Sequence, residues 1–169
     1  MRDVAALLND MVDAGVILQY ALFGAVAQMR YTEPVATLDA DVLVELSETS
    51  SLDLLAPIYQ FCKKRGHVAE GEAVRVGAWP VQFIPTFSEL TAEAVSNAET
   101  VDFEGIALRV VGPTHLAVIA LSVGRAKDWT RVLALLESES VTQDEISRLT
   151  ARHGLEDAWL LFQERFLDG

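Results

Sequence analysis

The chain has few of the residues that form covalent or metal cross-links in small proteins. Its single cysteine, Cys62, excludes a disulfide within the chain, and a lone thiol fits a reducing compartment such as the cytoplasm. Its three histidines, His67, His115 and His153, lack the spacing of metal ligands. We expect Cys62 to be a half-buried, unreactive thiol, His115 to stand at a helix start, and the other histidines to lie on the surface.

Positive charge is also scarce, with 13 Lys and Arg against 25 Asp and Glu and a net charge of −12. Because nucleic-acid binding depends on cations that neutralise phosphates, this balance disfavours a nucleic-acid partner. No apolar run approaches the ~20 residues that a membrane helix needs, and no basic segment followed by an apolar stretch marks a signal peptide. The sequence therefore predicts a cytoplasmic protein that does not cross a membrane.

What the chain does have is enough apolar residues, 51% of 169, for one compact domain with a sizeable core. Hydrophobic periodicity and turn residues predict an α/β (α+β) fold, in which a small mixed sheet in residues 1–112 is followed by a packed helical unit in residues 113–169. The predicted strands cover residues 16–23, 37–46 and 79–85, with hairpins at 67–76 and 101–111. The predicted helices cover residues 3–14, 25–29, 52–64, 89–98, 113–123, 127–136, 142–153 and 155–167, with candidate N-caps at 47–51.

Two carboxylates stand out in the predicted strand of residues 37–46. Asp39 and Asp41 are two residues apart, and in a strand such residues point to the same face. Two like charges side by side repel unless a cation lies between them, and a divalent cation prefers carboxylate oxygens. The pair therefore indicates a metal site, although two aspartates at a solvated strand end would give the same pattern.

Gly24 separates the first predicted strand from a short predicted helix. A glycine at such a turn lets the backbone approach a ligand closely, and the helix start that follows offers N–H groups to an anion. An anion beside a metal held by two aspartates is the layout that phosphoryl or nucleotidyl transfer needs.

These segments together resemble the glycine turn and DxD core of the nucleotidyltransferase superfamily, which has a DNA polymerase β-like fold. The likeness is nearest to the small bacterial group that includes AbiEii-type toxin domains, and it covers roughly residues 16–136. The segments that carry it are Phe23-Gly24-Ala25-Val26-Ala27, Arg30, Thr37-Leu38-Asp39-Ala40-Asp41, Val81-Gln82-Phe83-Ile84-Pro85, Pro113-Thr114-His115-Leu116 and Gly124-Arg125-Ala126-Lys127-Asp128.

The resemblance implies a metal-dependent enzyme that transfers a nucleotidyl group from a nucleoside triphosphate to a hydroxyl acceptor. Asp39 and Asp41 would be the catalytic metal ligands for Mg²⁺ or Mn²⁺. A protein hydroxyl, an RNA end or a small molecule all remain open as acceptor, and a protein partner or a homo-oligomer remains open too. The nucleotide-binding residues that the resemblance implies are Gly24, Ala25, Arg30, Thr37, Arg125 and Lys127.

Three departures from the family pattern bear on catalysis. Ala25 replaces the second glycine or serine of the turn, Gln82 stands where the family has a third carboxylate, and the helix of residues 116–121 has no charge. They support a second interpretation, in which the fold is a catalytically degenerate binding module, for example one half of a toxin–antitoxin-like pair.

The basic residues around Asp128 have two interpretations, and so does Arg30. Asp128 is three residues from both Arg125 and Arg131, a spacing that predicts ion pairs on a helix surface. The resemblance instead directs Arg125 and Lys127 to the nucleotide phosphates. Arg30 either reaches back towards the carboxylates or lies on the surface.

Overall fold

The computed structural model describes residues 1–47 and 53–167. The chain divides into two compact units, the first made of residues 1–27 and 36–111 and the second of residues 28–35 and 112–169. Apart from Ser47, the candidate N-caps at 47–51 and the predicted helix start at residue 52 lie outside the described residues. The two units are considered one at a time.

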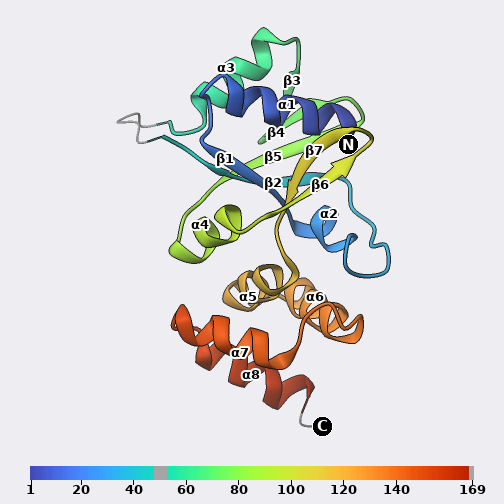
Figure 1. Ribbon diagram of the computed structural model, residues 1–169, viewed down its shortest axis with the longest axis vertical. Helices are drawn as coiled ribbons and strands as arrows, with labels where there is room; N and C mark the ends of the chain where they lie inside the picture. Colours follow the sequence, from blue (N-terminus) through green and yellow to red (C-terminus); the bar gives the residue numbers. More distant parts are fainter. Residues whose placement is uncertain (48–52, 168–169) are drawn as a thin grey trace. The chain divides into compact units, whose positions relative to one another are not determined.

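Within the described residues, the first unit forms a seven-stranded mixed sheet in the order β3-β4-β5-β2-β1-β7-β6 (Figure 1). β1 pairs with β2 antiparallel and with β7 parallel, and β2 pairs with β5 parallel. The strands are β1 (Gln19–Phe23), β2 (Ala40–Glu45), β3 (Val68–Glu70), β4 (Ala73–Val76), β5 (Trp79–Pro85), β6 (Glu99–Phe103) and β7 (Ile106–Val110). The helices that begin in this unit are α1 (Arg2–Asp13), α2 (Gly24–Gln28), α3 (Ala56–Lys64) and α4 (Glu89–Ser96).

The core of this unit is centred on β2. Val42 and Leu43 point to opposite faces of the sheet, and both are 0% exposed, so both faces of this strand are covered. The antiparallel hairpins β3–β4 and β6–β7 form the two edges of the sheet. The predicted α/β fold class and the predicted hairpins are therefore confirmed. With a hairpin at each edge, β2 is the middle strand of the sheet.

The second unit is helical. Pro113 stands in the first turn of α5, where a proline needs no N–H partner, and Gly124 ends that helix at φ +69°. α7 begins with the predicted capping box, in which hydrogen bonds from Thr142 lower the pKa of Glu145. The helices are α5 (Pro113–Val123), α6 (Ala126–Glu137), α7 (Gln143–Arg152) and α8 (Glu156–Phe166).

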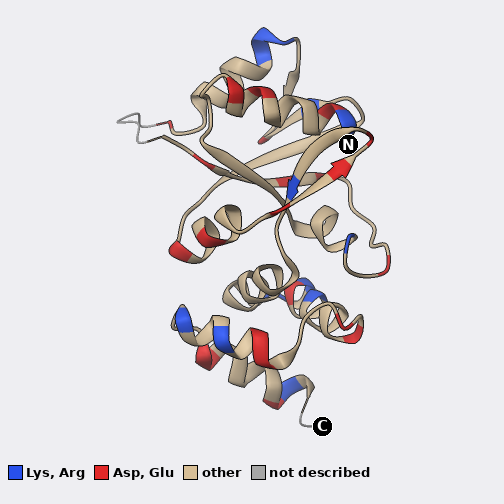
Figure 2. Cartoon of the chain, in the orientation of Figure 1, with Lys and Arg blue, Asp and Glu red and all other residues tan. Residues whose placement is uncertain are grey.

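Apolar and aromatic side chains hold these helices together. α5 buries the uncharged run of residues 116–121 and contacts α6, α7 and α8. Aromatic rings link α6 to α8, with the centroid of Trp129 5.5 Å from that of Phe166. Basic and acidic residues both occur along α7 and α8 (Figure 2). None of the helices in the described parts of the chain is long and apolar enough to span a membrane.

Cys62 provides a test of packing in the first unit. The residue is 1% exposed, so the expectation of a half-buried thiol was wrong, and burial raises the pKa of this thiol to about 11. Because only the thiolate reacts with disulfide reagents, we expect no labelling of the native protein by DTNB at pH 8 and one thiol per chain in denaturant. An Ala151→Cys variant, altered at an exposed position of α7, should gain one fast-reacting thiol. Rapid labelling of native wild type would contradict this packing.

Candidate functional site

The predicted glycine turn and the second aspartate of the DxD pair meet in the structure. β1 ends at Phe23, which lies opposite Asp41 on β2. Gly24 follows at φ +62° and begins α2. A Cβ built on Gly24 would overlap Oδ2 of Asp41 and would lie 3.1 Å from its Cγ. The Asp41 carboxylate therefore lies directly against the Gly24 backbone, and two independent constraints, a left-handed φ and a close contact, require glycine here.

The strand register identifies the other neighbours of Asp41. Asp41 pairs with Phe23 on one side and with Gln82 of β5 on the other, and Gln82 in turn pairs with Ala73 of β4. Residues that are directly opposite in adjacent strands point to the same face of the sheet. Gln82 therefore lies beside Asp41 on one face, in the place where the family resemblance puts a third carboxylate.

Asp39 is placed differently from the prediction. β2 begins at Ala40, so Thr37 and Asp39 precede the strand, and Asp39 is exposed. The Thr37 hydroxyl donates to the backbone carbonyl of Asp39 at 3.0 Å and approaches its Oδ1 at 3.3 Å. The predicted strand of residues 37–46 is thus wrong over residues 37–39, and strand alternation does not determine the direction of the Asp39 side chain.

β2 starts late because its pairing with both neighbouring strands begins only at Ala40 and Asp41. On the β1 side, Phe23 is the last residue before the turn, so pairing stops at Asp41. On the β5 side, the pairing begins at Ala40, which lies opposite Val81. A ladder without partners does not continue, and the chain bends at Asp39 instead.

The remaining turn residue, Ala25, is half-buried in the first turn of α2. It carries no hydroxyl, so only its backbone can interact with a ligand. Asp39 and Asp41 offer carboxylate oxygens and Gln82 an amide oxygen, which are the donor types that Mg²⁺ or Mn²⁺ accepts. In the described parts of the chain, no three His, Cys, Asp or Glu residues are grouped to share an ion. The strand register brings Asp41 and Gln82 side by side, whereas it does not determine where the Asp39 carboxylate points.

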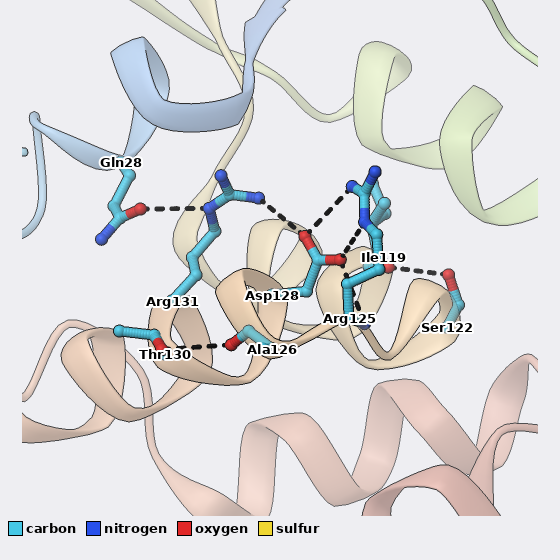
Figure 3. Close-up of polar contacts among 8 residues, drawn as sticks. All are labelled: Gln28, Ile119, Ser122, Arg125, Ala126, Asp128, Thr130 and Arg131. Carbon is cyan, nitrogen blue, oxygen red and sulfur yellow. Dashed lines mark hydrogen bonds and ion pairs between the residues drawn. The ribbon is translucent and has the colours of Figure 1, made fainter. Parts of the chain in front are cut away.

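In the second unit, Asp128 is the centre of a polar cluster (Figure 3). Its carboxylate accepts from Nε of Arg125 at 2.7 Å and lies 3.6 Å from Nη1 of Arg131. Nε of Arg131 donates to Oε1 of Gln28 at 3.0 Å. The ion pairs predicted from spacing therefore form, but Asp128 is 1% exposed, so they are not the surface pairs that we expected. A buried carboxylate requires such partners.

Sequence reasoning missed Gln28 as a member of this cluster. The residue is 5% exposed and ends α2, and its partner Arg131 follows 103 residues later. No local pattern connects residues so far apart, and an amide at a helix end has no distinctive spacing.

The other basic residues proposed for nucleotide binding also belong to the second unit. Arg125 keeps 60% of its side chain exposed despite its ion pair, and Lys127 and Arg30 are exposed. The guanidinium of Arg30 lies 5.7 Å from the ring centroid of Tyr31. The structure thus brings together Gly24 and Asp41 with Gln82 in the first unit, and it places Arg30, Arg125 and Lys127 in the second.

Comparison with known proteins identifies the fold. No family model and no curated protein sequence matches the chain. A crystal structure of an antigenic nucleotidyltransferase-like protein from Paracoccidioides brasiliensis is similar, with a TM-score of 0.56, 15% identity, and coverage of 93% of this chain and 90% of that one. The solution structure of the antibiotic-resistance factor ANT(2'')-Ia has a TM-score of 0.51 and 12% identity, over 96% and 97% of the chains. The chain therefore has a nucleotidyltransferase-like fold.

The effect of the close contact between Gly24 and Asp41 on the free energy of unfolding can be measured by substitution. Gly71 has nearly the same backbone angle, φ +63° against +62°, but a Cβ there meets nothing within 4 Å. We expect Gly71→Ala to cost about 1 kcal/mol of unfolding free energy through backbone strain alone. Gly24→Ala should cost a further ~1–3 kcal/mol, because the new methyl group displaces the carboxylate.

Urea denaturation followed by circular dichroism measures both variants. In an Asp41→Ala background, the penalty of Gly24→Ala should fall towards that of Gly71→Ala. Equal penalties for the two glycines in the wild-type background would show that Asp41 does not constrain the turn.

Proposed function

We propose that this protein is a metal-dependent nucleotidyltransferase that transfers a nucleotidyl group from a nucleoside triphosphate to a hydroxyl acceptor. The observation that carries the proposal is the Asp41 carboxylate, which lies against the Gly24 turn at the end of the buried strand β2. This arrangement occurs within a nucleotidyltransferase-like fold. Fold similarity alone does not establish activity, so the proposal depends on the residues at this site.

Asp41 and Asp39 would hold Mg²⁺ or Mn²⁺, with the amide oxygen of Gln82 next to Asp41. When bound, such a cation neutralises the charge that develops on the phosphates and polarises the phosphoryl oxygens. The Asp41 carboxylate would keep the cation at the start of β2, where the neighbouring strands β5 and β1 limit the movement of the backbone. Positioning of this kind is the main contribution of a protein to phosphoryl and nucleotidyl transfer.

The remaining proposed roles concern phosphate charge. The backbone N–H groups of Gly24 and Ala25 would donate to the triphosphate, because Ala25 has no side-chain donor. The exposed side chains of Arg125 and Lys127 would offset phosphate charge. Thr37, whose hydroxyl orders the Asp39 backbone, would keep Asp39 in its bend, and Arg30 would supply a further cation.

A second candidate function is a binding module that holds a nucleotide without transferring it. Gln82 favours it, because an amide beside Asp41 cannot act as a base or supply negative charge for a second metal ion. The nucleotide-bound form would then bind a protein partner or a second copy of the chain. The two functions share the same ligand and differ in turnover.

Replacing Asp41 separates a functional role from a structural one. Asp41→Asn removes one of two nearby negative charges, so we expect the ligand-free protein to be as stable as wild type or slightly more stable. Wild type should gain about 2.7 kcal/mol, or several degrees in melting temperature, from Mg²⁺ and a nucleoside triphosphate at about 100 times Kd. The variant should lose this gain. Melting curves with each of the four nucleoside triphosphates, with and without Mg²⁺, provide the measurement.

Asp13→Asn, altered at an exposed residue that ends α1, is the matched control and should keep the ligand-induced shift. If wild type shows no shift and Asp41→Asn melts well below it, Asp41 is a structural residue and the proposal fails. A metal-dependent shift without incorporation of labelled nucleotide into any component of a cell extract would favour the binding module.

A further inference from the structure

We propose that the groove between α3 and β3 binds a short extended peptide, which pairs with the open edge of β3 and places an apolar side chain in the groove beside an acidic one. This binding does not depend on nucleotidyl transfer. Gln82, beside Asp41, pairs with Ala73 of β4, and Ala73 and Val74 point to opposite faces of the sheet. Val74 lines the groove, so the groove lies on the face opposite to Asp41.

The first support is the open edge of the sheet at β3. This strand has β4 on one side and no strand of the described residues on the other. An edge strand offers backbone N–H and C=O groups that can pair with another chain. All three residues of β3 are exposed, and Val68 is 64% exposed. An added strand therefore has room to pair with β3.

The turn between β3 and β4 determines which backbone groups face the open edge. Glu70 and Ala73 close a two-residue turn in which Gly71 has φ +63°, and the residues that close such a turn form a hydrogen-bonded pair. Hydrogen-bonded and non-hydrogen-bonded pairs alternate along an antiparallel ladder. The next pair, Ala69 and Val74, therefore exchanges no hydrogen bonds, and the N–H and C=O of Ala69 point away from β4.

The turn between β4 and β5 gives the same answer independently. Val76 and Trp79 close this two-residue turn, so Val74, two residues earlier, forms a hydrogen-bonded pair with Val81 of β5. The N–H and C=O of one strand residue point to the same side, so those of Val74 pair with β5 and not with β3. The N–H and C=O of Ala69 are thus available to a partner.

The second support is a groove of about 470 Å³ beside β3. Val74 and Cys62, each 1% exposed, belong to its lining. The Tyr59 hydroxyl donates to the carbonyl of Glu72 at 2.8 Å and holds α3 against the β3–β4 turn. A peptide residue opposite Ala69 would point to the same face as Ala69 and Val74. That residue therefore enters the groove, where an apolar side chain fits the buried lining.

The charge of the groove indicates an acidic residue in the same peptide. The lining includes Lys63 and His67 and, among the described residues, no acidic side chain. In the part of the chain that the structure describes, Arg65 pairs with Asp10, whereas the exposed Lys63 has no acidic partner. A cation at the rim of an apolar groove favours a peptide with a complementary carboxylate. A helix beside an open strand edge is also a known arrangement for binding peptides by strand addition.

A phage-displayed library of random heptapeptides, selected on the full chain, supplies the probe. We expect the enriched peptides to share an apolar residue next to an acidic one. The most enriched peptide, labelled with a fluorophore, is then titrated by anisotropy. Ala69→Pro removes the outward N–H but no ladder bond, and it should weaken binding about tenfold. Lys63→Glu should weaken binding about fivefold, and Lys64→Glu, at the neighbouring exposed residue outside the lining, should have a smaller effect.

Melting curves test the strand geometry separately from the peptide. Ala69→Pro should melt close to wild type, whereas Val68→Pro should melt at a lower temperature, because the Val68 N–H belongs to the ladder with Arg75. If Ala69→Pro melts as low as Val68→Pro, Ala69 does not face the open edge and the proposal fails.

The binding results have equally definite consequences. Failure to enrich any peptide, equal affinity of wild type and Ala69→Pro, or equal effects of Lys63→Glu and Lys64→Glu would each overturn the proposal. Dimerisation of wild type that Ala69→Pro abolishes, without peptide binding, would replace it by edge-to-edge pairing of two copies. Each of these results leaves the proposed function at Asp41 untouched, because the groove lies on the other face of the sheet.

Discussion

The site of the first unit depends on the close approach of the Asp41 carboxylate to the backbone of Gly24. This contact is possible because β1 stops at Phe23, directly opposite Asp41, and because the next residue has no side chain. β2 itself cannot shift to relieve the contact, since Val42 and Leu43 are buried on opposite faces of the sheet. The packing of the core therefore determines where the carboxylate lies.

Charge is the second constraint, and it acts in both units. A chain with a net charge of −12 has no general attraction for a polyphosphate, so under the proposed function a cation would mediate between the ligand and the carboxylates of the first unit. In the second unit, Asp128 is buried and is held by Arg125 and Arg131. At Asp128 a negative group away from bulk water has its positive partners supplied by the chain.

Much of the fold could be predicted from the sequence, because local patterns determine it. The capping box of Thr142 and Glu145, the early proline at Pro113 and the glycine at Gly124 mark helix ends within a few residues of where they occur. Gly24 and Asp41 could also be singled out, since a glycine between a strand and a helix and an acid in an apolar strand are both unusual locally. Some predictions were wrong, because β2 begins after Asp39, Asp128 is buried, and Cys62 is fully rather than half buried.

The sequence by itself determined the residue types, most of the helices and strands, and the presence of a glycine turn followed by two aspartates. The tertiary structure alone decided which of these residues meet. Whether Asp39 belongs to β2 depends on where the pairing of β2 with β1 and β5 begins, and the position of Gln82 beside Asp41 depends on the register of two strands separated by about forty residues. The bond from Arg131 to Gln28 joins residues 103 apart. Such pairings are non-local, so no periodicity within a segment encodes them.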